Sequence, residues 1–365
     1  MVSTSSRARP KKKSAPHPKH AHDVPDPQGI RRLLLAWYRK VRRDLPWRRT
    51  QDPYAIWLSE VMLQQTRVET VIPYYARFLE AFPTVVALAE APLDRVLGAW
   101  SGLGYYRRAR MLHEGAQELA RSYGGELPRT SIALRGIRGI GPYTAGAVAS
   151  IAFGEAAALV DGNVHRVLAR VYAIDEDDAK TRKRAWEIAE QLVKGEAPGD
   201  FNQALMELGA TVCTPRPKCD QCPVASQCRA LAEGKEATLP RPKKRPEVPT
   251  LERTALVLER ADRAVLLARC GPEGRFAGLW EPPMLDGAVG AKAFGLGSAV
   301  AAGEVVHVLT HRRLQVHVLR GSEGAKAPKV APEYAEHRWV LPAEAKDIGV
   351  STLCRKVLRK AGLAW

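Results

Sequence analysis

The sequence predicts two folded domains: a mainly helical N-terminal domain that includes a four-cysteine loop, and a smaller α+β C-terminal domain. Three observations predict this division. Between residues 29 and 212, apolar residues recur at three- and four-residue spacings, as in helices. Residues 234–250 hold four prolines and several cations, a composition typical of a linker. Beyond the linker, the apolar pattern shortens to the period of strands.

The domain boundaries follow from the same patterns. Residues 1–28 are rich in Pro, Ser, Lys and His, which predicts a disordered basic arm. We place the helical domain at 29–231, the linker at 232–250 and the C-terminal domain at 251–365. No apolar run approaches the ~18 residues of a membrane span, and no apolar segment follows the basic N-terminus. We therefore expect a soluble intracellular protein without a membrane partner.

The charge of the chain predicts a polyanionic partner. Lys and Arg number 56 against 39 Asp and Glu, a net charge of +17. Residues 1–22 supply +6 of it and hold no acid, so the remainder still carries +11. Nucleic acid is the usual partner of such a surface, and a charge that serves only solubility is the alternative.

One helix of the N-terminal domain encloses an acid. Asp52 followed by Pro53 predicts an N-cap and a first helical residue for the segment "YAIWLSEVMLQQT". Its apolar residues surround Glu60, and desolvation favours the protonated form of a buried carboxyl. The structural alternative is a carboxylate bonded to backbone N–H groups or to Arg48. Further helices are predicted near 92–100, 105–122, 142–152, 164–173 and 182–194.

A glycine turn leads into the helix predicted near 142–152. Gly139 and Gly141 allow a tight turn and a close backbone approach, and Pro142 opens the helix. The free N–H groups at such a helix start can bind a phosphate of DNA without reading sequence. An ordinary packing contact between two helices is the alternative.

A second carboxylate precedes the next helix. Asp161 stands before Gly162 and Asn163 in "DGNVHRVLAR", where it can be an N-cap or an anion that the helix dipole keeps ionised. An acid that stays protonated, such as Glu60, and a carboxylate that stays ionised form the pair used to break glycosidic bonds.

Four cysteines lie between residues 213 and 228 and indicate a metal site. They are Cys213, Cys219, Cys222 and Cys228. Four thiolates suit structural zinc or an iron–sulfur cluster, and their spacing alone slightly favours zinc.

In the C-terminal domain, residues 254–260, 264–269 and 305–320 read as strands and residues 352–363 as a helix. Thr310 and His311 lie in the third strand pattern, and they can simply end a strand.

Six stretches together resemble the MutY family of adenine DNA glycosylases, within the helix-hairpin-helix glycosylases that include endonuclease III. They are "LPW", "SEVMLQQT", "GLGYY", "GIGPYTAGA", "DGNVHRVLAR" and the cysteine loop. The resemblance implies a helix-hairpin-helix domain, a Nudix-like C-terminal domain, and base excision repair of adenine opposite 8-oxoguanine or guanine in double-stranded DNA. We also expect a monomer in the cytoplasm, associated with the nucleoid if the source is bacterial.

The resemblance also implies roles for particular residues. Glu60 matches the acid that protonates adenine, and Asp161 matches the carboxylate that stabilises the sugar cation. Tyr143 and Asn163 match residues that support that step. Positions around the adenine pocket are matched by Trp47, Arg48, Leu63 and Glu207. Residues that enter the base stack are matched by Gln65 and Tyr105.

The reaction class depends on one position. Tyr143 occupies the site where lyases resembling endonuclease III carry a Lys, and tyrosine forms no Schiff base, so we expect a glycosylase without strand cleavage. A thymine mismatch glycosylase or a lyase on the same scaffold is the alternative, and a catalytically silent DNA-binding protein is a third hypothesis.

Two departures qualify the match. The family binds a 4Fe-4S cluster with six residues in the first cysteine gap, where this chain has five; zinc is the alternative. The family recognises 8-oxoguanine with a Phe-Ser-His triplet. This chain has Leu309, Thr310 and His311 at those positions.

Overall fold

The chain forms two compact units. A computed structural model describes residues 25–242, 247–273, 276–321 and 330–365. The first unit comprises Met1–Arg42 and Ala158–Lys243, and the second comprises Arg43–Ala157 and Lys244–Trp365. Most of the predicted basic arm and part of the predicted linker lie outside the described residues. In the part of the chain that is described, every helix is too short or too polar to cross a bilayer.

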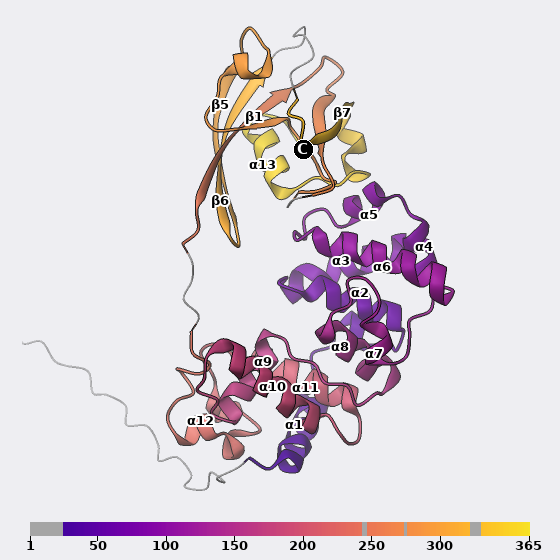
Figure 1. The fold of residues 1–365 in the computed structure, drawn as a ribbon, viewed down its shortest axis with the longest axis vertical. Coiled ribbons are helices and arrows are strands. Elements are labelled where there is room, and N and C mark those ends of the chain that lie inside the picture. The colour runs from indigo at the N-terminus through magenta and orange to yellow at the C-terminus, as the bar shows by residue number, and fades with distance from the viewer. Residues whose placement is uncertain (1–24, 243–246, 274–275, 322–329) are drawn as a thin grey trace, which may run out of the picture. The chain divides into compact units, whose positions relative to one another are not determined.

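The second unit begins with helical elements, in agreement with the helical apolar pattern of this region (Figure 1). They are η1 (Pro46–Arg48), α2 (Pro53–Leu63), α3 (Val68–Ala81), α4 (Val85–Glu90), α5 (Leu93–Ala99), α6 (Arg107–Tyr123), α7 (Ser131–Leu134) and α8 (Pro142–Phe153). The predicted cap of α2 is confirmed, because the Asp52 carboxylate accepts the Tyr54 N–H at 2.9 Å.

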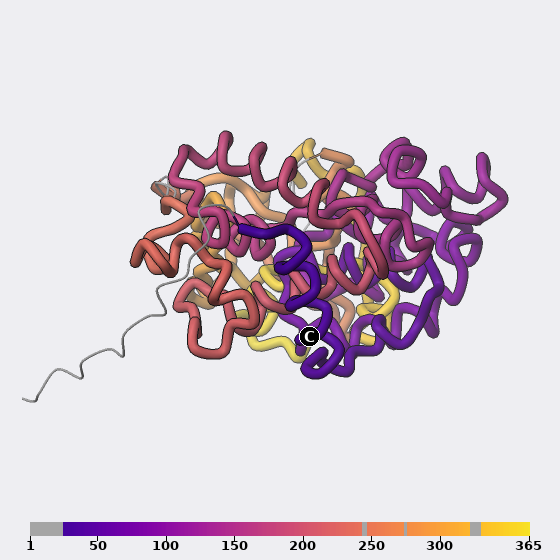
Figure 2. Tube along the Cα trace, turned by 90° about the horizontal axis from the view of Figure 1, so that it is seen from below, coloured from indigo at the N-terminus to yellow at the C-terminus, as the bar shows by residue number. Residues whose placement is uncertain are grey.

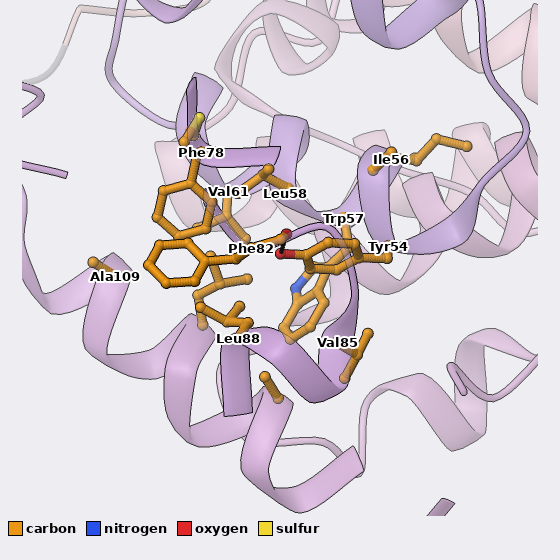
Figure 3. Packing of buried hydrophobic residues seen from close by; sticks show 14 of the residues in the cluster. Tyr54, Ile56, Trp57, Leu58, Val61, Phe78, Phe82, Val85, Leu88 and Ala109 are labelled. Carbon is orange, nitrogen blue, oxygen red and sulfur yellow. Dashed lines mark hydrogen bonds between the residues drawn. The ribbon is translucent and has the colours of Figure 1, made fainter. Parts of the chain in front are cut away.

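Helix α2 is the centre of this helical part. Its residues from Tyr54 to Met62 are all buried, as in a core helix that is packed on every side. Figure 3 shows Tyr54, Trp57 and Val61 in one cluster with Phe78 and Phe82. The Tyr54 hydroxyl donates to the Phe82 carbonyl at 2.9 Å. This packing holds the acid of α2 inside an apolar core.

The rest of the second unit is the predicted α+β domain. Its strands form two sheets, with orders β4-β1-β6-β5 and β3-β2-β7. Their bounds, with those of the helices, are β1 (Thr250–Leu258), β2 (Val265–Cys270), β3 (Trp280–Glu281), β4 (Met284–Asp286), η4 (Ala291–Phe294), β5 (Val300–Leu309), β6 (Arg312–Gly321), β7 (Tyr334–Val340), η5 (Pro342–Lys346) and α13 (Thr352–Lys360).

The pairing of these strands places a hairpin turn at two predicted site residues. Strand β6 pairs parallel to β1 and antiparallel to β5, with Leu309 opposite Arg312. Thr310 and His311 therefore form the turn between β5 and β6, where we predicted a continuous strand pattern. Helix α13 covers the core of the domain with Leu353, Val357 and other buried residues.

The first unit is helical. Its elements are α1 (Pro27–Val41), α9 (Gly162–Val171), α10 (Asp178–Leu192), α11 (Pro198–Thr211), η2 (Cys219–Gln221), η3 (Ala225–Gln227) and α12 (Arg229–Ala232). Helix α11 packs against both α1 and α9, and α1 is the indigo helix in both views (Figure 1 and Figure 2). The guanidinium of Arg31 caps α10 by donating to the carbonyls of Leu192 and Val193 at 3.0 and 3.2 Å.

Candidate active site and cysteine loop

Glu60 and Tyr143 meet in the core of the second unit. Glu60 is 3% exposed in the middle of α2, and Tyr143 is the second residue of α8, which packs on α2. The Tyr143 hydroxyl donates a hydrogen bond of 2.6 Å to Oε2 of Glu60. The acid thus has a side-chain donor that orients it, and a carboxyl group in its protonated form can act as a general acid.

The predicted pocket residues divide between the units. Trp47 is buried and makes an edge contact with Tyr75, with ring centroids 5.5 Å apart. Arg48 donates to the Arg43 carbonyl at 3.1 Å, and Leu63 ends α2 half-buried. Glu207, 1% exposed in α11, belongs to the first unit.

Asp161 caps α9 in the first unit. Its Oδ1 accepts the backbone N–H groups of Asn163 and Val164 at 2.9 and 2.7 Å, and its Oδ2 accepts the Asn163 amide at 3.1 Å. The predicted N-cap is confirmed, and the same contacts fix the orientation of the carboxylate.

The position of Asn163 depends on residues that the sequence analysis missed. The Asn163 amide oxygen accepts a hydrogen bond of 2.9 Å from Arg166, which also donates to the Cys213 and Gly209 carbonyls, each at 2.8 Å. A Cβ atom on Gly209 would lie 2.7 Å from the Asn163 Cβ, so α11 needs glycine there. The one signal for Arg166 is its position one turn after Asn163.

The glycine turn before α8 has one crowded and one open glycine. Gly139 has φ +83°, and a Cβ atom there would lie 2.9 Å from the Met111 Cβ. Gly141 has extended backbone, and a Cβ atom there would meet no atom of the described residues within 4 Å. The predicted close approach within the chain thus applies to Gly139, whereas Gly141 leaves open space beside the helix N-terminus.

Two candidate base-stack residues are exposed and left-handed. Gln65 has φ +58° and Tyr105 has φ +51°, a region that non-glycine residues rarely adopt. Tyr105 is 46% exposed, and its hydroxyl lies 3.5 Å from the Thr310 hydroxyl. The second unit therefore brings together Tyr105 and the β5–β6 turn, 205 residues apart in sequence.

The four cysteines line one cavity of the first unit, between α9, α11 and the loop after α11. None of them forms a disulfide. Among the described residues, no three His, Cys, Asp or Glu side chains are arranged to hold a single metal ion. Burial raises the pKa of Cys222 to about 12 and that of Cys228 to about 11, so thiolates there require a cationic centre.

Arg170 binds the five-residue segment between Cys213 and Cys219. It donates to the carbonyls of Thr214 at 2.6 Å and Pro215 at 3.1 Å, and its Nη1 lies 3.5 Å from Cys213 Sγ.

Comparison with known proteins matches both parts of the chain. Residues 58–191 match the family model of the HhH-GPD superfamily base excision DNA repair protein, and residues 254–360 match a NUDIX domain. The chain is 40% identical to human adenine DNA glycosylase over 410 residues, which cover 92% of this chain and 74% of the human protein. It is 39% identical to the adenine DNA glycosylase of Arabidopsis thaliana, over 80% of this chain and 56% of that one. Among solved structures, a thermostable thymine-DNA glycosylase superposes with a TM-score of 0.52 and 33% identity, over 57% of this chain and 97% of that one.

Proposed function

The chain belongs to the adenine DNA glycosylase family, and from this premise we propose how its residues excise adenine and which mispairs it reads. It is a base excision repair enzyme that acts on DNA, a hydrolase of the N-glycosidic bond of adenine. The observation that supports the mechanism best is the hydrogen bond of 2.6 Å from Tyr143 to the buried Glu60.

Glu60 is the general acid of this mechanism. It is buried in the apolar surroundings of α2, and the hydrogen bond from Tyr143 orients its carboxyl group. Proton transfer to the flipped adenine makes the base a better leaving group. A positioned acid contributes ~10²–10⁴-fold to the rate, so a second group must stabilise the transition state as well.

Asp161 is that second group. As the base leaves, positive charge develops on the deoxyribose, and an anion close to it lowers the barrier. Two backbone N–H groups and the Asn163 amide orient the Asp161 carboxylate. Water then completes hydrolysis of the glycosidic bond. We assign contacts with the flipped base to Trp47, Arg48 and Leu63 of the second unit and to Glu207 of the first.

The enzyme leaves an abasic site without cutting the strand. Tyr143 stands where a lyase needs an amine, and its hydroxyl is hydrogen-bonded to Glu60. The likeness to a thymine-DNA glycosylase structure favours thymine excision as the second candidate.

Labelled duplexes with A:8-oxoguanine, A:G and T:G mispairs separate these activities. We expect adenine release from the first two and strand breaks only after alkali. Thymine release, or strand cleavage without alkali, would contradict the proposal.

The β5–β6 turn reads the base opposite adenine. Thr310 presents a hydroxyl at the exposed turn beside Tyr105, and His311 is exposed next to it. A hydroxyl that can donate or accept a hydrogen bond suits 8-oxoguanine, which carries an added oxygen and an added N–H group. Gly139 shapes the turn before α8, and the open backbone at Gly141 binds a phosphate of the same DNA. The enzyme binds this DNA as a monomer.

Cys213, Cys219, Cys222 and Cys228 hold a 4Fe-4S cluster. Four thiols around one cavity suit a multi-atom cluster, the centre that the family resemblance implies, and zinc is the alternative. When bound, the cluster cross-links the loop after α11 and so stabilises the fold. Visible absorbance with about four irons per chain is the expected result, and a colourless protein with stoichiometric zinc would reject it.

A further inference from the structure

Arg108, in the first turn of α6, closes the end of the helix that contains Glu60. Its Nη1 donates to the carbonyls of Val61 at 2.8 Å and Met62 at 2.9 Å, and also to the Gln64 carbonyl. These carbonyls belong to the C-terminal turn of α2, where backbone acceptors have no partner within the helix. A cation at this end also interacts favourably with the helix dipole.

The same guanidinium reaches into a second loop. Its Nη2 donates to the Thr66 hydroxyl at 3.0 Å and to the Gly104 carbonyl at 3.3 Å. The guanidinium carbon lies 5.2 Å from the Tyr105 ring centroid and 5.4 Å from that of Trp100. One side chain therefore joins the loop after α2 to the loop before α6.

These contacts bracket both candidate base-stack residues. Arg108 donates to the Gln64 carbonyl and to the Thr66 hydroxyl, which lie on either side of Gln65. It also donates to the carbonyl of Gly104, the residue before Tyr105, and its guanidinium stacks on the Tyr105 ring. Gln65 and Tyr105 are also the two residues in these loops with left-handed φ outside glycine, a conformation that persists only where neighbouring contacts impose it. Arg108 supplies such contacts to both.

We propose that Arg108 is a positioning residue that fixes Gln65 and Tyr105 in one geometry for extrusion of the target base. The inference rests on the proposed function, in which these two side chains enter the base stack. Five hydrogen bonds from one planar fork to four carbonyls and a hydroxyl require arginine, since lysine offers a single nitrogen. Burial lowers the pKa of Arg108 to about 10, which still leaves it protonated at neutral pH.

The test compares two substrates on each preparation of Arg108→Lys, Arg108→Met and wild type. The first is a duplex with a single A:8-oxoguanine pair. The second carries mismatched pairs on both sides of that adenine, which lowers the cost of extrusion. Arg107→Met is the matched control, because Arg107 lies next to it on the same helix and is exposed.

For both Arg108 variants we expect single-turnover base release from the first duplex to fall roughly 10- to 100-fold, the equivalent of one lost base stack. Release from the second duplex should return to within about threefold of wild type, since little stacking is then left to replace. The ratio of the two rates cancels any loss of folded protein. Arg107→Met should leave the ratio unchanged.

An equal loss of rate on both duplexes would show that Arg108 has only a structural role and would overturn the proposal. Wild-type rates of the Arg108 variants on both duplexes would also overturn it. Fluorescence of 2-aminopurine beside the target adenine reports extrusion independently of chemistry, and it should decrease with the Arg108 variants. If wild-type protein released no adenine from either duplex, the proposed function would fail, whereas the fluorescence comparison would still decide the role of Arg108.

Discussion

Replacing Tyr143 with Phe tests the mechanism most directly. The substitution removes one hydroxyl and leaves the ring that packs at the start of α8. Its hydrogen bond to Glu60 is short, 2.6 Å, and the acceptor is 3% exposed, so water cannot easily replace the lost donor. A hydrogen bond to a carboxyl contributes between ~0.5 and ~3 kcal/mol, depending on the charge of the acceptor.

The rate should fall because this interaction orients the acid in the transition state. At 1.4 kcal/mol for each factor of ten, a loss of ~1.4–2.8 kcal/mol corresponds to ~10–100-fold slower base release. The assay is single-turnover release of adenine from a labelled A:8-oxoguanine duplex, with alkali to reveal abasic sites. The dissociation constant of the duplex should change much less than the rate constant.

Tyr54→Phe is the matched control. Tyr54 is also a buried tyrosine of this unit, and its hydroxyl donates to the Phe82 carbonyl at 2.9 Å, away from the acid. The control substitution should lower the free energy of unfolding by ~1 kcal/mol and leave the single-turnover rate unchanged. A Tyr143→Phe rate within twofold of wild type, or an equal loss of rate in both variants, would refute the role given to this hydroxyl.

Three further predictions concern charge. Asp161→Asn keeps the α9 cap, since Asn caps about as well as Asp, but removes the anion; single-turnover release should fall ~10²–10³-fold with little change in melting temperature, and retained activity would contradict the sugar-stabilising role. Duplex affinity, measured by fluorescence anisotropy, should decrease linearly on a log–log plot against salt, because Lys and Arg displace cations from phosphates; a flat plot would argue against a basic DNA surface. Burial raises the pKa of Glu281, so the folded state binds the extra proton, and stability should decline as pH rises from about 4.5 through the folded pKa. Glu281→Gln should flatten that decline in thermal unfolding measured against pH, and an unaltered slope would assign it to other groups.

Local patterns were enough to predict most elements. The caps at Asp52 and Asp161 and the helical spacing of residues 29–212 depend on neighbours within a turn or two, which the sequence displays directly. The limits of the same approach appear at Tyr105. The predicted helix at 105–122 begins at Arg107, because Tyr105 has φ +51° and so cannot continue a right-handed helix.

A turn inside a strand pattern is another limit. Residues 305–320 alternate like a strand throughout, yet the chain reverses at Thr310 and His311. Neither residue is a glycine or an asparagine, so the usual turn signal is missing. Pairing of β5 with β6 decides the reversal, and that pairing is a property of the whole sheet.

By itself the sequence determined the helical and α+β division, the acid on a buried helix, the carboxylate at a helix start and the group of four cysteines. Tertiary structure alone decided that Tyr143 donates to Glu60, 83 residues away, and that Arg108 joins two loops around Gln65 and Tyr105. A cap or an apolar period is set by residues that are close along the chain. A side-chain contact between two helices depends on how those helices pack, and that packing is set by every residue of the core.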